Sequence, residues 1–366
     1  MSSVWLPCGD YHQNYHEDQG WWQSKFIKGK MILLLLIVFV GIPLFFDGYW
    51  ISVATMVGYT AMGALGVQLL IGYAGLLTLG HAAFIAVGAY TSTMLVLQFP
   101  WPQFMVEWGL SYPVSVIAAG VVAGLWSVLF GLPSVKVKGF YLILTTMAAQ
   151  FITVDFILTQ YVSQIGGRGQ AFSLPPGTIK IGPWVIDNEL SVYLVMAVLL
   201  TVMVIVLANL LRSKPGRAWV AIRDNDIAAE ALGINIIWYK LLAFFVAGFM
   251  AGIAGAFWVC NTAALSPEHF PWFLSLWLVG VILIGGVGSI QGAIFGSVFM
   301  VVVMELLQLA VIPLSDYYPR ILMDFAYFKD MAFGLAICGF LIYEPNGLAY
   351  RWWQAKNYFN LLPFSY

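Results

Sequence analysis

Residues that could carry catalytic chemistry are few in this chain and lie far apart. It has four histidines and three cysteines, the latter at Cys8, Cys260 and Cys338. An enzyme site needs a nucleophile, a base or metal ligands brought together, and cysteines this far apart indicate neither a metal site nor a disulfide framework. The phosphate-binding pattern G-x-x-x-x-G-K-[ST] is missing, since the single Gly-Lys pair, Gly29-Lys30, precedes a methionine. We therefore expect no catalytic residue, metal or cofactor on this chain.

The densest cluster of charge lies in the middle of the chain, within GRAWVAIRDNDIAAEALGIN (216–235). Its charged residues are Arg217, Arg223, Asp224, Asp226 and Glu230. On both sides of this stretch the sequence is almost uninterrupted apolar residues and glycine. Such a cluster indicates a segment that leaves the apolar part of the molecule and meets water or another protein.

A short helix is expected inside this cluster. Pro215-Gly216 breaks the helix that precedes it, Asp226 is the best N-cap candidate for a helix over 227–232, and Gly233 stands where a left-handed residue ends a helix. A helix of six residues is not stable alone in water. Two interpretations stay open: a solvated connector, or a docking element whose small residues Ala228, Ala229 and Ala231 admit a partner inside a polar rim.

The composition indicates the medium in which the rest of the chain lies. Hydrophobic residues make up 61% of the 366 residues, charged residues 9%, and the mean hydropathy is +0.87. A soluble domain has about 45–50% apolar and about 25% charged residues, so the medium of this chain must be lipid. A crossing needs about 20 apolar residues. The sequence predicts an all-α polytopic membrane bundle of eight to ten spans, with ten candidates at 31–48, 50–71, 78–98, 113–132, 139–160, 190–211, 240–262, 271–286, 291–312 and 326–343.

The distribution of positive charge orients these spans. With the N-terminus inside and ten crossings, 12 of the 16 Lys and Arg residues lie in inner segments, and only Arg168, Lys180, Arg320 and Lys329 lie outside. Cytoplasmic loops are expected to carry this excess. We therefore predict a cytoplasmic tail (1–30), a membrane domain (31–348) with one long cytoplasmic loop (212–239), and a second cytoplasmic tail (349–366).

Glycines interrupt two spans in corresponding halves of the chain, at Gly72, Gly75 and Gly80 and at Gly285, Gly286 and Gly288. Small residues in a membrane usually serve close helix packing. The alternative is broken helices beside a substrate path, and the two interpretations stay open. Other polar groups that could line such a path are Gln68, Thr78, His81, Thr145, Thr146, Gln150 and Glu305. Of these, a lone histidine is more often structural, and Glu305 is expected to face the protein interior because charge in a span is costly.

The charged segment also resembles a known motif. Ile227-Ala228-Ala229, three further residues and then Gly233 is similar to the EAA loop of importer-type ABC transporter permeases, with Ile227 where the general motif has an acid. The longer run GRAWVAIRDNDIAAEALGIN…KLLAFFVAGFMAGIAGAF resembles the permeases of the branched-chain amino-acid uptake family, which includes urea and short-amide importers. Five other stretches resemble the same family and occur in the family's order: GYAGLLTLGHAAFIAVGAY (72–90), GFYLILTTMA (139–148), LSPEHF (265–270), VILIGGVGSIQGAIFG (281–296) and EPNGL (344–348). GGRG (166–169) resembles it in part.

This resemblance implies a bacterial inner-membrane permease subunit of an ATP-driven importer, not an enzyme. It implies ATP-Mg on two separate ATPase subunits, a second homologous permease, an extracytoplasmic solute-binding protein, and no nucleic acid. The solute is expected to be a branched-chain amino acid first, and urea or a short amide next. The implied ATPase-coupling residues are Arg217, Asp226, Ile227, Ala228, Ala229, Glu230 and Gly233. A stand-alone channel or secondary carrier is the alternative, although spans with so few charges argue against a proton- or sodium-driven carrier.

Overall fold

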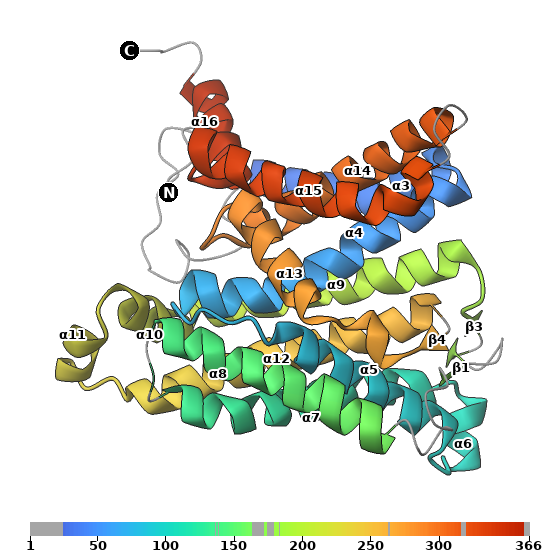
Figure 1. The fold of residues 1–366 in the computed structure, drawn as a ribbon, viewed down its shortest axis with the longest axis horizontal. Coiled ribbons are helices and arrows are strands. Elements are labelled where there is room, and N and C mark those ends of the chain that lie inside the picture. Colours follow the sequence, from blue (N-terminus) through green and yellow to red (C-terminus); the bar gives the residue numbers. More distant parts are fainter. Residues whose placement is uncertain are drawn as a thin grey trace.

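The computed structural model describes residues 25–135, 137, 139–162, 172–173, 179–182, 184–262, 264–315 and 320–361, and most of them are helical (Figure 1). Three helices contain π-helical segments, η1 to η3, and η4 is a 3-10 turn. In chain order the elements are α2 (Lys25–Leu36), η1 (Ile37–Gly41), α3 (Ile42–Phe45), α4 (Gly48–Val67), η2 (Gln68–Tyr73), α5 (His81–Leu97), α6 (Gln103–Glu107), α7 (Ser111–Val135), α8 (Phe140–Gln150), η3 (Phe151–Val162), β1 (Phe172–Ser173), β2 (Lys180–Ile181), β3 (Trp184–Val185), α9 (Glu189–Arg212), α10 (Lys214–Asp224), α11 (Asp226–Ala231), α12 (Ile236–Thr262), β4 (Ala264–Leu265), η4 (Pro267–His269), α13 (Trp272–Gly285), α14 (Ile290–Ser315), α15 (Arg320–Tyr343) and α16 (Gly347–Leu361).

Membrane-spanning length and composition are confirmed for most of the predicted spans. Within the described residues, 7 helical segments are long and apolar enough to cross a bilayer, and there are 8 if the pair Tyr327–Tyr343 and Gly347–Tyr358, bent by 45°, is one span. Two shorter apolar helices, Met31–Phe45 and His81–Leu97, coincide with the remaining two predicted segments. The chain is thus a polytopic helical membrane protein, and the count of ten stays a prediction.

The core forms where α12 packs against α7 and α5. The contact depends on glycines spaced four apart, Gly248 and Gly252 on α12. A Cβ added at Gly252 would lie 2.5 Å from Ala119 O and 2.8 Å from Gly120 Cα. The Ser127 hydroxyl donates to Phe244 O across the same interface at 2.6 Å. Small residues let the backbones approach, which is how helices associate where lipid supplies no hydrophobic drive between them.

The two ends of the bundle differ in structure. One end, here called the sheet end, carries two small antiparallel sheets, in which β1 pairs with β4 and β2 with β3. These strands are an exception to the all-α prediction, because loop backbone outside helices still needs hydrogen-bond partners. Gly182 N–H also donates to Gly109 O at 3.4 Å. The opposite end, here called the arm end, carries the charged arm (α10 and α11) (Figure 1). The GGRG stretch (166–169) lies outside the described residues.

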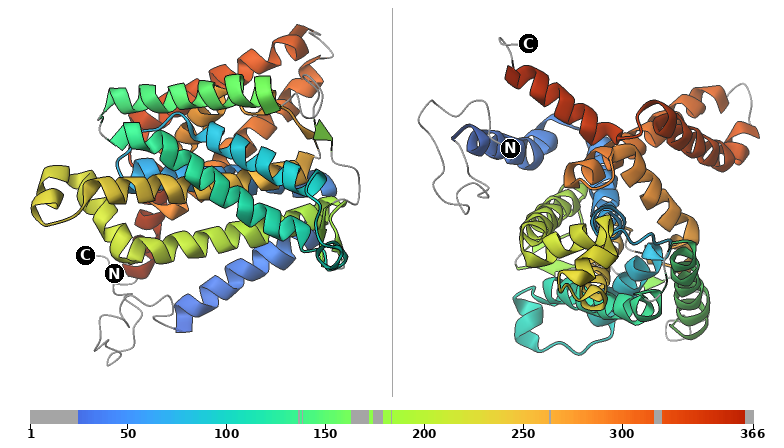
Figure 2. Two further views of the ribbon diagram at one scale, coloured as in Figure 1. Left: turned by 90° about the horizontal axis from the view of Figure 1, so that it is seen from below. Right: turned by 90° about the vertical axis from the view of Figure 1, so that its left-hand side faces the viewer.

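The first and last helices lie at the periphery. The helix formed by α2, η1 and α3, and the helices α14 to α16, spread away from the central cluster in the view along the bundle (Figure 2). The Tyr193 hydroxyl of α9 donates to Val38 O of η1 at 2.8 Å. Helix α2 starts at Lys25 and α16 runs to Leu361, so both predicted tails contain helix. The division into tails and membrane domain stays a prediction.

Candidate functional site

The first glycine cluster interrupts the chain between α4 and α5. After η2 the backbone turns at Gly75, whose φ is +70°, and Leu76 N–H donates back to Leu70 O at 2.8 Å. Residues 74–80 are not helical, and α5 starts at His81, which is fully buried. Left-handed backbone is inexpensive only for glycine. The two interpretations of this cluster were close helix packing and a broken helix. The structure has a break between two helices here.

Side chains from other helices satisfy the amides that this break exposes. Leu79 N–H donates to the Thr146 hydroxyl of α8 at 3.1 Å, and Ala82 N–H donates to the Ser275 hydroxyl of α13 at 2.9 Å. Gly80 N–H donates to the Thr78 hydroxyl at 3.3 Å. Irregular backbone at membrane depth is tolerated only where it is buried in protein and its polar groups are paired.

The second glycine cluster separates α13 from α14. Gly286 and Gly288 have φ values of +115° and +85°, and Ser289 caps α14 by accepting a hydrogen bond from Gly292 N–H at 2.8 Å. The turn between α15 and α16 packs on this break: a Cβ added at Gly347 would lie 2.5 Å from Gly286 N. The stretches containing GGVGS and EPNGL, far apart in sequence, are thus in contact.

The two breaks meet inside the protein. The fully buried Gln68 amide of η2 donates to Gly286 O at 3.1 Å and to Ser289 O at 2.9 Å. A Cβ added at Gly72 would lie 2.7 Å from Gly288 N. Corresponding interruptions in the two halves of the chain thus form one polar junction, held by Gln68 and by backbone contact.

Arg223 brings the charged arm to this junction. Its Nη1 donates to Gly72 O at 2.7 Å, while Nε and Nη2 bond to Asp224 Oδ1 at 3.1 and 2.9 Å. From the sequence alone, Arg223 was expected to belong to the polar rim around a partner contact. A sequence feature that could have indicated this inward contact is the position of Arg223, two residues before the cap Asn225. Arg223 lies in the last turn of a helix that was not predicted.

That helix is α10. The preceding helix does end close to Pro215, at Arg212, as predicted. A second helix that was not predicted starts directly afterwards, with Pro215 in its first turn, where proline is favourable because its missing N–H needs no helical partner. The N-cap prediction was wrong. The cap of α11 is Asn225, whose Oδ1 accepts from Ala228 N–H at 3.1 Å, and Asp226 is the first helical residue. Gly233 has a φ of +84°, as predicted.

The tip of the charged arm exposes large apolar side chains. Ile227 is 74% exposed and Leu232 82%, and Ala228 is exposed beside them. One expectation needs correction, because Ala229 is buried against the protein's own chain at 2% exposure and does not face outward. Arg217 is exposed and donates to Arg212 O at 2.9 Å, and its coupling role stays a prediction. The exposed surface of α11 and the residue after it is therefore built from Ile227, Ala228 and Leu232, with Glu230 exposed next to them.

Several predicted path residues lie away from the junction. The Thr145 hydroxyl bonds within α8, to Leu142 O at 2.9 Å, and the Gln150 amide donates to Phe270 O at 2.9 Å. His81 packs on α4, where a Cβ added at Gly66 would lie 2.6 Å from its Nε2. These contacts place the three residues around the junction and not in it.

Glu305 was expected to face the protein interior. It is half-buried on α14, and the Tyr49 hydroxyl at the start of α4 donates to it. Helix α4 reaches the arm end with Gln68, so its start lies toward the opposite end. Glu305 is therefore separate from the Gln68 junction, and the hydroxyl partner offsets the cost of its charge.

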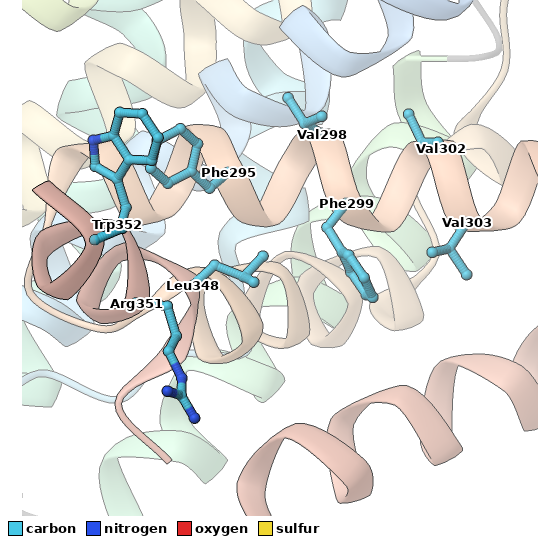
Figure 3. Close-up of a pocket in the computed structure, with 9 residues that line it drawn as sticks. Phe295, Val298, Phe299, Val302, Val303, Leu348, Arg351 and Trp352 are labelled. Carbon is cyan, nitrogen blue, oxygen red and sulfur yellow. The ribbon is translucent and has the colours of Figure 1, made fainter. Parts of the chain in front are cut away.

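A cavity of about 680 Å³ lies between α14 and α16 (Figure 3). It is lined mainly by apolar side chains, with Arg351 at its edge: Phe295, Val298, Phe299, Val302, Val303, Leu348, Arg351, Trp352 and Ala355. None of the predicted path residues lines it. Among the described residues no group of three or more His, Cys, Asp or Glu side chains could hold a metal ion.

Comparisons with known proteins give matches along most of the chain. A family model described as the branched-chain amino acid transport system permease component matches residues 49–339. The high-affinity branched-chain amino acid transport system permease protein LivM of Salmonella typhimurium is 28% identical over 344 residues, which cover 88% of this chain and 75% of LivM. LivM of Escherichia coli is 27% identical with the same coverage. The autoinducer 2 import system permease protein LsrC of Salmonella typhi is 25% identical over 334 residues, 87% of each chain. No solved structure matches the chain.

Proposed function

The chain belongs to the permease family of branched-chain amino acid transport systems, and on that premise we propose that it is the membrane-spanning subunit of an ATP-driven importer. The energy comes from ATP-Mg on two separate ATPase subunits. A second, homologous permease chain completes the pathway, and an extracytoplasmic binding protein delivers the solute. The complex resides in a bacterial inner membrane, with ten crossings of this chain and both termini in the cytoplasm.

The observation that carries the proposal is the apolar tip of the charged arm. Ile227 and Leu232 are among the most exposed large hydrophobic residues, yet they lie on the segment with the most charge in the chain. An apolar centre with a charged surround is typical of a protein interface. Because α11 has only six residues, it needs such a partner surface for stability. A cytoplasmic ATPase supplies it.

The arm is also joined to the part of the molecule that has to move. Arg223 contacts Gly72 in the first helix break, and Gln68 joins that break to the second. Transporters place broken helices beside the substrate path. A stand-alone channel or secondary carrier accounts for the spans but gives the exposed tip no role.

We propose a branched-chain amino acid as the solute, with urea or a short amide next. The LivM proteins carry branched-chain amino acid transport in their names, whereas LsrC is named for autoinducer 2 import, so the wider group of relatives covers more than one solute. Binding of radiolabelled leucine, isoleucine, valine and urea to the cognate binding protein tests this choice.

The docking proposal is tested by Ala228→Arg. The substitution places a long charged side chain on the exposed face of α11, where it blocks an apolar contact without touching the membrane core. We expect normal membrane insertion and loss of the ATPase subunits when the complex is purified from native membranes. Gln354→Arg is the matched control, because it adds the same residue to an exposed position on α16. Retained ATPase and full leucine uptake in Ala228→Arg contradict the proposal.

A further inference from the structure

Arg223 has a second feature that the docking role of the arm does not use. Its side chain is 38% exposed, but its guanidinium points back into the protein and not toward the tip of the arm. The inference drawn from this contact rests on the proposed function.

The helix that carries Arg223 is fixed to the bundle. Trp219 of α10 is fully buried, and its Nε1 donates to Tyr239 O at the start of α12 at 2.7 Å. Asp224 holds two of the guanidinium nitrogens of Arg223 and leaves Nη1 for Gly72 O. Charge-assisted hydrogen bonds of this kind are about twice as strong as neutral ones. The side chain is therefore held in one orientation.

One guanidinium reaches both helix breaks. A Cβ added at Gly75 would lie 2.9 Å from Arg223 Cγ, and one added at Gly288 would lie 3.5 Å from Arg223 Nη1. The carbonyl of Gly72 belongs to the last turn of the helix formed by α4 and η2. The negative end of the helix dipole lies there, so a positive charge stabilises it.

We propose that Arg223 is a positioning residue that couples the position of the charged arm to the two helix breaks. A single residue, Asn225, separates α10 from α11, so movement of α11 by a bound ATPase is passed directly to Arg223. While the Nη1 bond to Gly72 O is intact, the arm is tied to the first break, which Gln68 and backbone contact join to the second. When the arm moves away, that bond breaks and the two breaks lose the support of the arm.

The test uses the complex purified from native membranes with Arg223→Gln, Arg223→Lys and the control Lys214→Gln. The control removes one positive charge from an exposed position on the same helix. Three quantities are measured: ATPase subunits retained, ATP hydrolysed per leucine taken up into proteoliposomes, and hydrogen exchange of amides 72–76 and 286–289 in this chain.

In Arg223→Gln we expect full retention of the ATPase subunits and continued ATP hydrolysis. Uptake per ATP is expected to fall by about tenfold or more, as loss of a hydrogen bond to a charged group implies, and both amide groups exchange faster. Arg223→Lys keeps a positive donor and restores part of the coupling, while Lys214→Gln behaves like the wild type. A role in folding alone predicts parallel loss of assembly and hydrolysis, without partial rescue of coupling by lysine.

The inference is overturned by loss of the ATPase subunits from Arg223→Gln, as in Ala228→Arg, by wild-type uptake per ATP, or by unchanged exchange at both breaks. Failure of the proposed function looks different, because the wild-type chain then purifies without any ATPase. In that case the exchange measurement on the chain alone decides whether Arg223 holds the breaks, and a change at only one break also overturns the inference.

Discussion

At the scale of single residues, Gly72 and Gly288 decide how closely the two halves of the chain approach. A Cβ at Gly72 would lie 2.7 Å from Gly288 N, a distance that real Cβ atoms do not reach, and Gly288 adopts a φ of +85° that side chains rarely permit. Backbone contact between the breaks therefore requires glycine at both positions, for steric reasons at the first and conformational reasons at the second.

Glu305 gives a prediction at the same scale. Because Glu305 accepts a hydrogen bond from the Tyr49 hydroxyl away from the Gln68 junction, we predict that its role is structural. The amide oxygen of Glu305→Gln still accepts that bond, so we expect uptake within about twofold of the wild type, since an exposed or half-exposed substitution usually costs under 0.5 kcal/mol. Leucine uptake into proteoliposomes between mildly acidic and neutral pH provides the measurement.

Tyr49→Phe is the companion variant for this prediction, since it removes the donor and leaves the carboxylate. A loss of uptake in Glu305→Gln together with a changed pH dependence is the result that contradicts a structural role, because it assigns proton transfer to the carboxylate.

Sequence reasoning identified many residues of the junction but not their partners. Gln68, Thr78 and Thr146 stood out because polar groups are rare in the spans, and all three make the break hydrogen bonds described here. Ser275 and Ser289 did not stand out, because serine is common in membrane helices as a helix-packing residue. Arg223 was expected in the polar rim of a docking surface, and its contact with Gly72 was not predicted because it spans 151 positions of the sequence.

At the scale of elements, helix existence was easier to predict than helix ends. Each apolar segment of about 20 residues became a helix, because a bilayer leaves the backbone few other ways to satisfy its polar groups. The charged arm has no such constraint. In the arm, proline can either end a helix or occupy its first turn, and Pro215 occupies the first turn of α10. Asn and Asp are both good cap residues, and Asn225, not Asp226, is the cap of α11.

The packing of α12 on α7 gives the prediction at this scale. Gly252→Ala places a methyl group 2.5 Å from Ala119 O, and overpacking of this kind costs about 1–3 kcal/mol. We expect a lower melting temperature and less monodisperse protein in detergent. Gly334→Ala in α15 is the matched control, because no atom lies within 4 Å of the added Cβ and alanine favours helix.

Equal melting temperatures for the Gly252→Ala and Gly334→Ala variants contradict this account of the core. They mean that the α12 and α7 backbones can separate at no cost, and that the glycines serve something other than close approach.

At the scale of the whole molecule, contacts between distant segments divide the chain into two ends. Gly72, Arg223, Gly288 and Gly347 belong to contacts at the arm end. Hydrogen bonds at the sheet end join Gly109 to Gly182, and β1 to β4. Between residues 72 and 347 the chain therefore passes from one end to the other with α5, with α7 and α8, and then with α9, α12, α13, α14 and α15.

This alternation supports the predicted count of ten, since α4 and the helix formed by α2, η1 and α3 add two passes before residue 72. It also explains why length alone indicates fewer crossings. The non-helical residues 74–80 cover part of the distance that a helix covers in other spans, so the helix His81–Leu97 is short although the segment that contains it is not.

Labelling with a membrane-impermeant thiol reagent in intact cells tests the orientation. In a background without Cys8, Cys260 and Cys338, the sheet-end variants Trp108→Cys and Trp184→Cys are expected to react, because both positions are exposed and predicted to lie outside. Tyr343→Cys, which is exposed at the arm end, is expected to react only after the cells are opened, and Leu232→Cys only after the cells are opened and the ATPase subunits are removed, because it lies in the proposed docking surface. Opposite reactivity of Trp108→Cys and Trp184→Cys contradicts ten crossings, because two passes, α7 and α8 with η3, separate these positions and must return the chain to the same side.

Labelling of Leu232→Cys in intact cells contradicts the whole proposal, since it places the docking tip on the side of the membrane where no ATPase operates.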